Sequence, residues 1–364
     1  MSIGSASSMQ LLKKRAKTRQ LLVLMTGLAA STCLFSQTAP HTEQHAGYVP
    51  LISGGMGYVH NISGGSPSLE PQIDPVLLVP FGSHLLLESR TDFTGFFQRQ
   101  DQTSGPFKGK VFKNVEFAEL DWLADTHVTA VVGKYLLPFG LFNERLEPIW
   151  IRNLQDPPLA ASIGTRTSGA GDGLMLRGAG FRGNGYSTQY SGYFSAHSGI
   201  NQLEAARTAG GDFSVYLPHA GLELGTSWQR FLQQRRITNS AAYISWQPAG
   251  ASLDLKAEYD HSFYGHGYWI ETAYRLDRSS FPAAVHNFQL VGRFQDLLPF
   301  NGGGNGVPRV RTQRADLGLN YYLRDNLRIL SSYDRSLSRQ HDLNVWNFGA
   351  VYRFSIPLWP ERKR

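Results

Sequence analysis

Cysteine is almost absent from this chain, and its scarcity excludes several kinds of protein. The 364 residues contain one cysteine, Cys33, which lies in an apolar N-terminal run. Residues 34–364 therefore offer no disulfide, no metal thiolate and no thiol nucleophile. Without such cross-links, the fold has to be stabilised by the packing of its own elements or by a membrane.

Long apolar segments are scarce as well, since nothing after residue 40 resembles a transmembrane helix. Leu21–Phe35 is a mainly apolar run of about 15 residues, shorter than the roughly 20 that a spanning helix needs. A basic stretch precedes this run, and small or polar residues follow it as far as Pro40. This order predicts a secretory signal peptide over residues 1–37, with an N-terminal membrane anchor as the alternative.

A large charge of one sign is also missing from the expected mature chain. The formal net charge is +7, but residues 1–37 hold five basic and no acidic side chains, and Glu361–Arg364 contribute a net +2. The remaining chain is therefore close to neutral. Nucleic-acid binding requires a basic face, so we expect no nucleic-acid partner.

Aromatic side chains, glycine and alternation are what the chain has in quantity. Aromatic residues make up 12% of the sequence, and there are 38 glycines. In Leu343–Ile356, Trp346 and Phe348 alternate with Val345 and Asn347. The same period of two recurs in Tyr186–His197, Ser252–His261, Phe288–Gln295 and Arg314–Tyr321. Strands with one face in lipid and the other in water have this period, so the pattern predicts an all-β, transmembrane antiparallel β-barrel, with a β-sandwich as the alternative.

The connections between these segments alternate between short and long. Pro248–Gly250 and Leu323–Asn326 read as short turns, whereas Arg99–Gly109 is expected to form a longer loop. Short periplasmic turns and longer extracellular loops are typical of outer-membrane barrels. The count predicts about sixteen strands, with both termini in the periplasm. Two strands are doubtful, Asp212–Leu217 because it is short and Ile73–Pro80 because of its prolines, and without them fourteen strands remain.

One connection breaks this pattern. Residues Leu136–Gly171 contain Pro138, Pro148, Pro157 and Pro158 and show little alternation. An irregular segment of this length usually has a function. Its many apolar side chains would be costly to expose to water, which predicts that this third external loop folds into the barrel lumen. An exposed surface loop or a small helical cap is the alternative.

Several stretches near this loop and near the C-terminus resemble a known family. Gly133–Leu141 has a glycine, a basic residue and then proline–phenylalanine, as in the phosphate-selective porin O and P family. Arg166–Gly169 and Asp172–Leu176, where the chain returns to a strand, fit the same pattern. Leu317–Leu323 and Val351–Phe354 resemble that family's last hairpin and closing strand. The resemblance covers most of the expected barrel and implies a water-filled pore.

The chain departs from that family at two points. It continues past the closing strand, and it lacks the ladder of arginines and the lysine cluster on which phosphate selectivity depends. The resemblance therefore implies a pore without implying phosphate. We expect four segments: a signal peptide over 1–37, a flexible segment over 38–47, the barrel over 48–356, and a C-terminal extension over 357–364.

These features predict an outer-membrane porin, a passive channel for small hydrophilic solutes or ions. A closed outer-membrane barrel that acts as an adhesin or structural anchor is the alternative. No spacing brings a nucleophile, a base and an orienting acid together, so we expect no enzyme activity, no cofactor and no metal site. The expected partners are outer-membrane lipid and the permeating solutes, with a homotrimer left open.

The candidate site is the constriction that the third external loop would form. Its predicted residues are Lys134, Glu144, Arg145, Glu147, Arg152 and Arg166. The pore wall opposite or above them is predicted to carry Arg90, Arg293 and Arg314. Over this loop and the inward faces assigned from alternation, ten basic side chains stand against eleven acidic ones. Interleaved charges of opposite sign largely cancel, so weak ion selectivity is expected.

Overall fold

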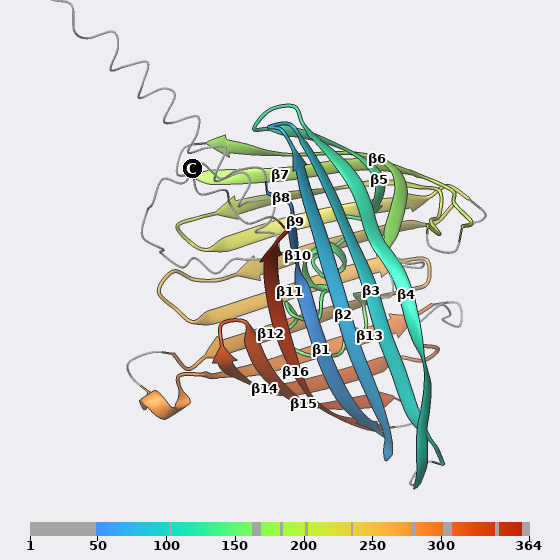
Figure 1. Ribbon diagram of the computed structural model, residues 1–364, viewed down its shortest axis with the longest axis vertical. Helices are drawn as coiled ribbons and strands as arrows, with labels where there is room; N and C mark the ends of the chain where they lie inside the picture. Colours follow the sequence, from blue (N-terminus) through green and yellow to red (C-terminus); the bar gives the residue numbers. More distant parts are fainter. Residues whose placement is uncertain are drawn as a thin grey trace, which may run out of the picture.

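Sixteen antiparallel strands close into a barrel in the computed structural model (Figure 1). The structure describes residues 49–101, 104–161, 169–182, 185–200, 203–233, 236–277, 281–300, 308–338 and 342–358. Strands adjacent in sequence are adjacent in space, and β1 pairs with β16 from Leu51 opposite Pro357 to Ser63 opposite Val345. The predicted barrel of sixteen strands is confirmed, and the alternatives of fourteen strands or a sandwich are wrong. The predicted signal peptide, the flexible segment and most of the C-terminal extension lie outside the described residues.

The strands and helical turns have the following bounds, in chain order. The first eight strands are β1 Leu51–Ser63, β2 Ser66–Phe81, β3 Leu85–Asp101, β4 Ser104–Leu123, β5 Val128–Leu136, β6 Ala170–Arg182, β7 Tyr186–Ala196 and β8 Thr208–Leu217. The last eight are β9 Leu222–Phe231, β10 Thr238–Trp246, β11 Leu253–Ser262, β12 Gly265–Arg275, β13 Phe288–Pro299, β14 Thr312–Arg324, β15 Leu327–Ser338 and β16 Leu343–Pro357. Two short helical turns are η1 Phe142–Leu146, a π-helix, and η2 Ala283–Val285, a 3₁₀ turn.

The two faces of the wall differ in polarity, as the alternation predicts. On β14, Leu317 is 66% exposed on the exterior, whereas Asp316 and Asn320 are fully buried on the interior. On β16, Trp346 and Phe348 are exposed in the same way. A closed sheet that is apolar outside and polar inside satisfies its backbone hydrogen bonds within the wall and suits a lipid bilayer. Among the described residues, no helix has the length and apolar character to cross a membrane.

Both doubtful segments are strands of the barrel. Asp212–Leu217 is the second half of β8, and Ile73–Pro80 lies within β2. Proline has no backbone N–H to donate, and the ladder between β2 and β3 accordingly has no pairs at Pro71 or Pro75. On its other side, β2 pairs with β1 without a break. A strand between two neighbours can therefore carry prolines where one ladder is interrupted.

The connections match the predicted alternation only in part. At one end of the barrel, short turns join β4 to β5, β10 to β11 and β14 to β15, as expected, although residues 276–287 between β12 and β13 are longer. At the other end, the prediction of a long loop over Arg99–Gly109 is wrong, because β3 continues to Asp101 and β4 begins at Ser104. Gly64 and Gly65 also make a tight turn between β1 and β2. Longer connections at this end, as predicted, join β7 to β8 and β13 to β14, and the longest joins β5 to β6.

A charge placed on the exterior tests which face meets lipid. Replacing Leu317 with arginine, near the middle of β14, should lower the free energy of unfolding by about 2–4 kcal/mol, because a cation at mid-depth in a bilayer is poorly solvated. Leu323 lies on the same face of β14 near its end, and Leu323→Arg should cost no more than about 1 kcal/mol. Urea unfolding in lipid vesicles measures both. Equal costs at the two positions would contradict a lipid-facing exterior.

Candidate functional site

The described part of the connection between β5 and β6, residues 137–161, leaves the wall and bonds to the inward side chains of distant strands. We call this segment the inner loop. The Gly140 N–H donates to Ser227 Oγ of β9 at 2.8 Å, and the Leu159 N–H donates to Gln295 Oε1 of β13 at 2.7 Å. Asn153 Nδ2 donates to Glu271 Oε1 of β12 at 2.9 Å. Figure 1 shows the segment in green within the outline of the barrel.

Apolar side chains of the inner loop pack against one side of the barrel interior. Leu141 and Ala160 join a buried cluster with Tyr243, Trp269 and Leu297. Ile149 packs with Val59, Leu330 and Val351, and Leu154 packs with Ala273 and Val291. Burying a side chain of this size contributes about 1.5–3 kcal/mol. The inner loop is thus held against β10–β16 and β1 by packing as well as by hydrogen bonds.

Two glycines of the wall make room for the largest of these side chains. A Cβ on Gly55 of β1 would lie 2.4 Å from the ring of Trp150, and one on Gly318 of β14 would lie 2.6 Å from Leu154. Neither contact is compatible with a side chain, since real Cβ atoms do not approach neighbours this closely. The wall is therefore shaped locally to receive the inner loop.

Three arginines on this side of the wall donate hydrogen bonds to backbone carbonyl groups of the inner loop. Arg293 donates to Asp316 at 2.7 Å and to the carbonyl oxygen of Asp156 at 2.8 Å. Arg314 donates to the carbonyl of Pro157 at 2.8 Å, and Arg328 donates to that of Arg152 at 2.6 Å. Arg293 and Arg314, which were predicted to lie on the pore wall opposite or above the constriction, bond directly to the inner loop.

The opposite side of the interior, on β2–β4 and β6, meets the inner loop through charges. Arg90 of β3 contacts Glu147 of the inner loop at 2.6 Å and Glu116 of β4 at 3.9 Å. Asp74 of β2 and Asp92 of β3 lie close by, because the Gln72 amide donates to both carboxylates. Four carboxylates therefore surround one guanidinium.

A second group has the same composition. Arg177 of β6 donates to Asp121 of β4, lies 3.5 Å from Glu119 and 3.8 Å from Glu144 of the inner loop. Glu88 of β3 is paired with Glu119 in the strand register. We call the eight carboxylates of both groups the acidic face; they are Asp74, Glu88, Asp92, Glu116, Glu119, Asp121, Glu144 and Glu147.

The two arginines of the inner loop, Arg145 and Arg152, are both bonded to neighbouring groups. Arg145 makes a bidentate contact with Glu223 of β9 at 2.8 and 2.9 Å, and its guanidinium lies over the ring of Tyr243. Burial lowers the pKa of Arg145, but the Glu223 carboxylate outweighs this and the net pKa is raised. Arg152 donates to the carbonyl of Gln155, and burial lowers its pKa. Arg145 keeps its charge and shares it with a carboxylate, so it adds little free positive field.

The predicted site residues therefore separate into groups. Glu144 and Glu147 lie on the inner loop and reach Arg177 and Arg90, respectively. Lys134 of β5 is buried and lies opposite Asp172 in the register of β5 and β6, and the carboxylates of Glu116, Asp172 and Glu204 are near enough to interact with its charge. Arg166 lies outside the described residues.

Sequence reasoning missed Arg177, Glu116, Glu119, Asp121 and Asp74. Arg177 had a usable signal, because it alternates with Leu174 and Leu176, which are exposed on the exterior. Glu119 and Asp121 had the same signal, because they alternate with the exposed Leu120 and Trp122. Glu116 had none, because the register between β3 and β4 shifts at Arg90 and Thr91. That irregularity brings both Glu116 and Glu119 inward, which no strict period of two allows.

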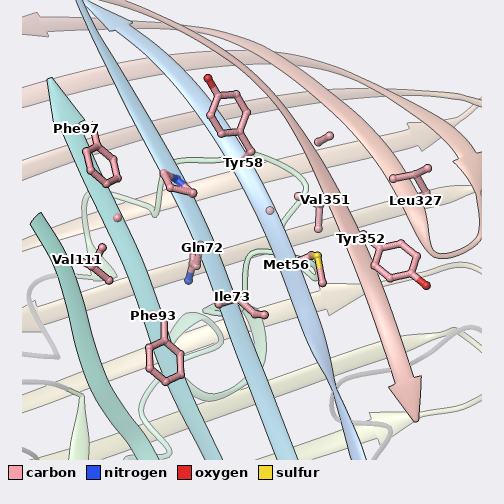
Figure 2. Close-up of a pocket in the computed structure, with 14 residues that line it drawn as sticks. Met56, Tyr58, Gln72, Ile73, Phe93, Phe97, Val111, Leu327, Val351 and Tyr352 are labelled. Atoms are coloured by element: carbon pink, nitrogen blue, oxygen red, sulfur yellow. The ribbon is translucent and has the colours of Figure 1, made fainter. Parts of the chain in front are cut away.

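A hollow of about 580 Å³ lies on the exterior, away from the inner loop (Figure 2). Exposed apolar side chains such as Met56, Tyr58 and Ile73 line it, with Phe93 and Tyr352 on neighbouring strands. Its position on the lipid-facing surface sets it apart from any path through the barrel. Within the described ranges, no three histidine, aspartate or glutamate side chains are arranged to hold a metal ion.

Comparison with solved structures identifies the fold. OmpF of Salmonella typhi superimposes with a TM-score of 0.57 at 12% identity, covering 86% of this chain and 100% of that one. OmpT, an outer-membrane protein of Vibrio cholerae, gives 0.53 at 9% identity, with 86% and 100% covered. An anion-selective porin from Comamonas acidovorans gives 0.51 at 10% identity, with 84% and 98% covered. The chain has the fold of outer-membrane porins.

The comparisons stop at the fold. No protein-family model matches the sequence, and no curated protein matches it significantly. The predicted resemblance to porins is confirmed at this coarser level, while the phosphate-selective family itself is not.

Proposed function

We propose that the chain forms a passive, water-filled channel for small hydrophilic solutes or ions across the outer membrane. The observation that carries this proposal is an interior lined with charged side chains inside an apolar exterior, as Asp316 and Leu317 illustrate on β14. A barrel of sixteen strands encloses an aqueous channel rather than a packed core. The inner loop is then the constriction, because it occupies part of that interior.

Passage through such a channel is diffusion, with no covalent step. The width that the inner loop leaves free and the charges along that opening decide which solutes pass. Glu144, Glu147 and Arg90 belong to the constriction in this proposal, whereas Arg145 and Arg152 hold the inner loop in place. The barrel sits in outer-membrane lipid, and a homotrimer is part of the proposal; a trimer form is known for OmpT of Vibrio cholerae.

The resemblance to the phosphate-selective family supports a pore and adds no specificity for phosphate. That specificity depends on arginines and lysines that converge in the lumen. Among the described residues, Arg90 and Arg177 are each surrounded by carboxylates, and Arg293 is bonded to Asp316 and to the inner loop. A phosphate ion would meet more negative than positive charge there.

Conductance of the purified protein in a planar lipid bilayer tests the proposal. We expect discrete, stepwise current increases of uniform size, because each inserted channel adds one fixed opening. A barrel that is folded by circular dichroism and by its heat-dependent migration in gels, yet passes no current, would overturn the proposal. That result would favour the closed adhesin or anchor.

A further inference from the structure

We propose that this channel selects cations over anions, through the acidic face and the two loop carboxylates that belong to it. The inference rests on the proposed function and names the class of solute for the same site. It also replaces the near balance of charge expected from sequence.

The two sides of the barrel interior differ in how the inner loop meets them. Against β10–β16 and β1 the inner loop packs through buried apolar clusters around Leu141, Ile149 and Leu154, and its carbonyl groups accept from arginines of the wall. Against β2–β4, and at Arg177 of β6, the contacts are ionic, through Glu147 to Arg90 and Glu144 to Arg177, while Leu137 packs against Met175 elsewhere on β6. The side chains of Glu144 and Glu147 remain 32% exposed. In the proposed channel, a passing solute therefore meets these two partly exposed carboxylates.

The charge on that side is strongly unequal. The eight carboxylates of the acidic face stand against two guanidinium groups, those of Arg90 and Arg177, and the ammonium of Lys134 near Glu116, which leaves a formal surplus of five negative charges. Arg145 does not reduce the surplus, because Glu223 offsets it. Lys108 and Lys110 lie further along β4, toward the end of the β3–β4 hairpin. Along the opening itself, no comparable group of cations faces the carboxylates in the described part of the chain.

One carboxylate of this face also has an unused acceptor. Asp121 is fully buried and accepts from Arg177 through Oδ2, but no donor among the described residues reaches its Oδ1. A buried carboxylate oxygen without a donor is costly. Its one cation is also shared, because Arg177 contacts Glu119 and Glu144 as well as Asp121.

A wall of one charge sign in a low-dielectric channel focuses the field and concentrates its counter-ion. The acids come from two parts of the chain. Glu144 and Glu147 lie on the inner loop, and the other six acids lie on strands of the barrel wall. Glu147 and Glu144 lie 2.6 and 3.8 Å from the wall arginines that they share with the wall acids, closer than the Debye length of about 8 Å at physiological salt, so salt does not screen these charges fully. Potassium should thus enter more readily than chloride.

The reversal potential of the unmodified protein across a potassium chloride gradient tests the inference directly. We expect a sign that reports cation flow, with potassium favoured over chloride by about tenfold. A reversal potential near zero, or one of the opposite sign, from a conducting channel would overturn the cation preference and leave the pore intact. A folded protein without current would instead overturn the proposed function.

The double variant Glu144→Gln/Glu147→Gln assigns the effect to the acidic face. Removing two of the surplus charges from the inner loop should lower the potassium-to-chloride permeability ratio by about threefold, with conductance retained. Asp342→Asn is the matched control, because Asp342 is 53% exposed outside the inner loop and removes one charge of the same sign. An unchanged permeability ratio in the double variant would contradict the assignment of cation selectivity to Glu144 and Glu147. If the variant does not fold, the reversal potential of the unmodified protein still tests the cation preference.

Discussion

Deletion of Glu147–Gln155 is expected to raise the single-channel conductance by about two- to threefold, because it removes much of the constriction while the wall remains closed. The deleted residues include Ile149, Trp150 and Leu154, whose side chains hold the inner loop against the barrel interior. None of them belongs to a strand, so the ladder from β1 to β16 is untouched. Conductance in planar bilayers is the measurement.

A deletion outside the inner loop controls for general damage. Phe281–Val285 lies in the connection between β12 and β13, and its removal should leave conductance unchanged. Circular dichroism and heat-dependent gel migration show whether each barrel is closed. A closed barrel that lacks Glu147–Gln155 and conducts like the unmodified protein would mean that the inner loop does not limit passage.

Replacing Arg293 with methionine is expected to lower the free energy of unfolding by about 3–5 kcal/mol, because it leaves buried carboxylates without their cation. The Arg293 side chain is 3% exposed and lies 2.7 Å from Asp316, which is fully buried, and 3.7 Å from Glu271. The substitution also removes the bond to the carbonyl of Asp156, so the inner loop loses one of its supports. Urea unfolding followed by circular dichroism measures the loss.

The control for this substitution is an exposed ion pair of the same kind. Arg335 and Asp342 are 54% and 53% exposed and 3.4 Å apart. Arg335→Met should change stability by less than about 1 kcal/mol, because water solvates both partners when the pair is broken. Similar losses for Arg293→Met and Arg335→Met would show that burial of the Arg293 pair does not decide its contribution.

The barrel was predictable because one face of each strand meets lipid. In β14 and β16 an exposed apolar residue such as Leu317 or Trp346 alternates with a polar or small inward one, and this period is local in sequence. The signal fails where local chemistry conflicts with tertiary context. Prolines made β2 doubtful, although their missing N–H groups affect only one of its two ladders.

The candidate site was predictable in outline only. Prolines and apolar residues marked Leu136–Gly171 as exceptional, but the partners of Glu144 and Glu147 depend on the register of β3, β4 and β6. A shifted register at Arg90 determines which acids of β4 point inward, and a count along the sequence misses it. The expected balance of charge included cations such as Arg293 and Arg314, which bond to the inner loop, and the sequence alone does not show that contact.

Ile149 touches three strands that come from the two ends of the barrel sequence. Its partners are Val59 of β1, Leu330 of β15 and Val351 of β16, so a residue from the middle of the chain spans the seam where the first and last strands join. Separating β1 from β16 would require breaking the hydrogen bonds between these two strands and also removing Ile149 from its contacts with them. The inner loop thus also helps to hold β1 against β16 and should resist lateral opening of the barrel.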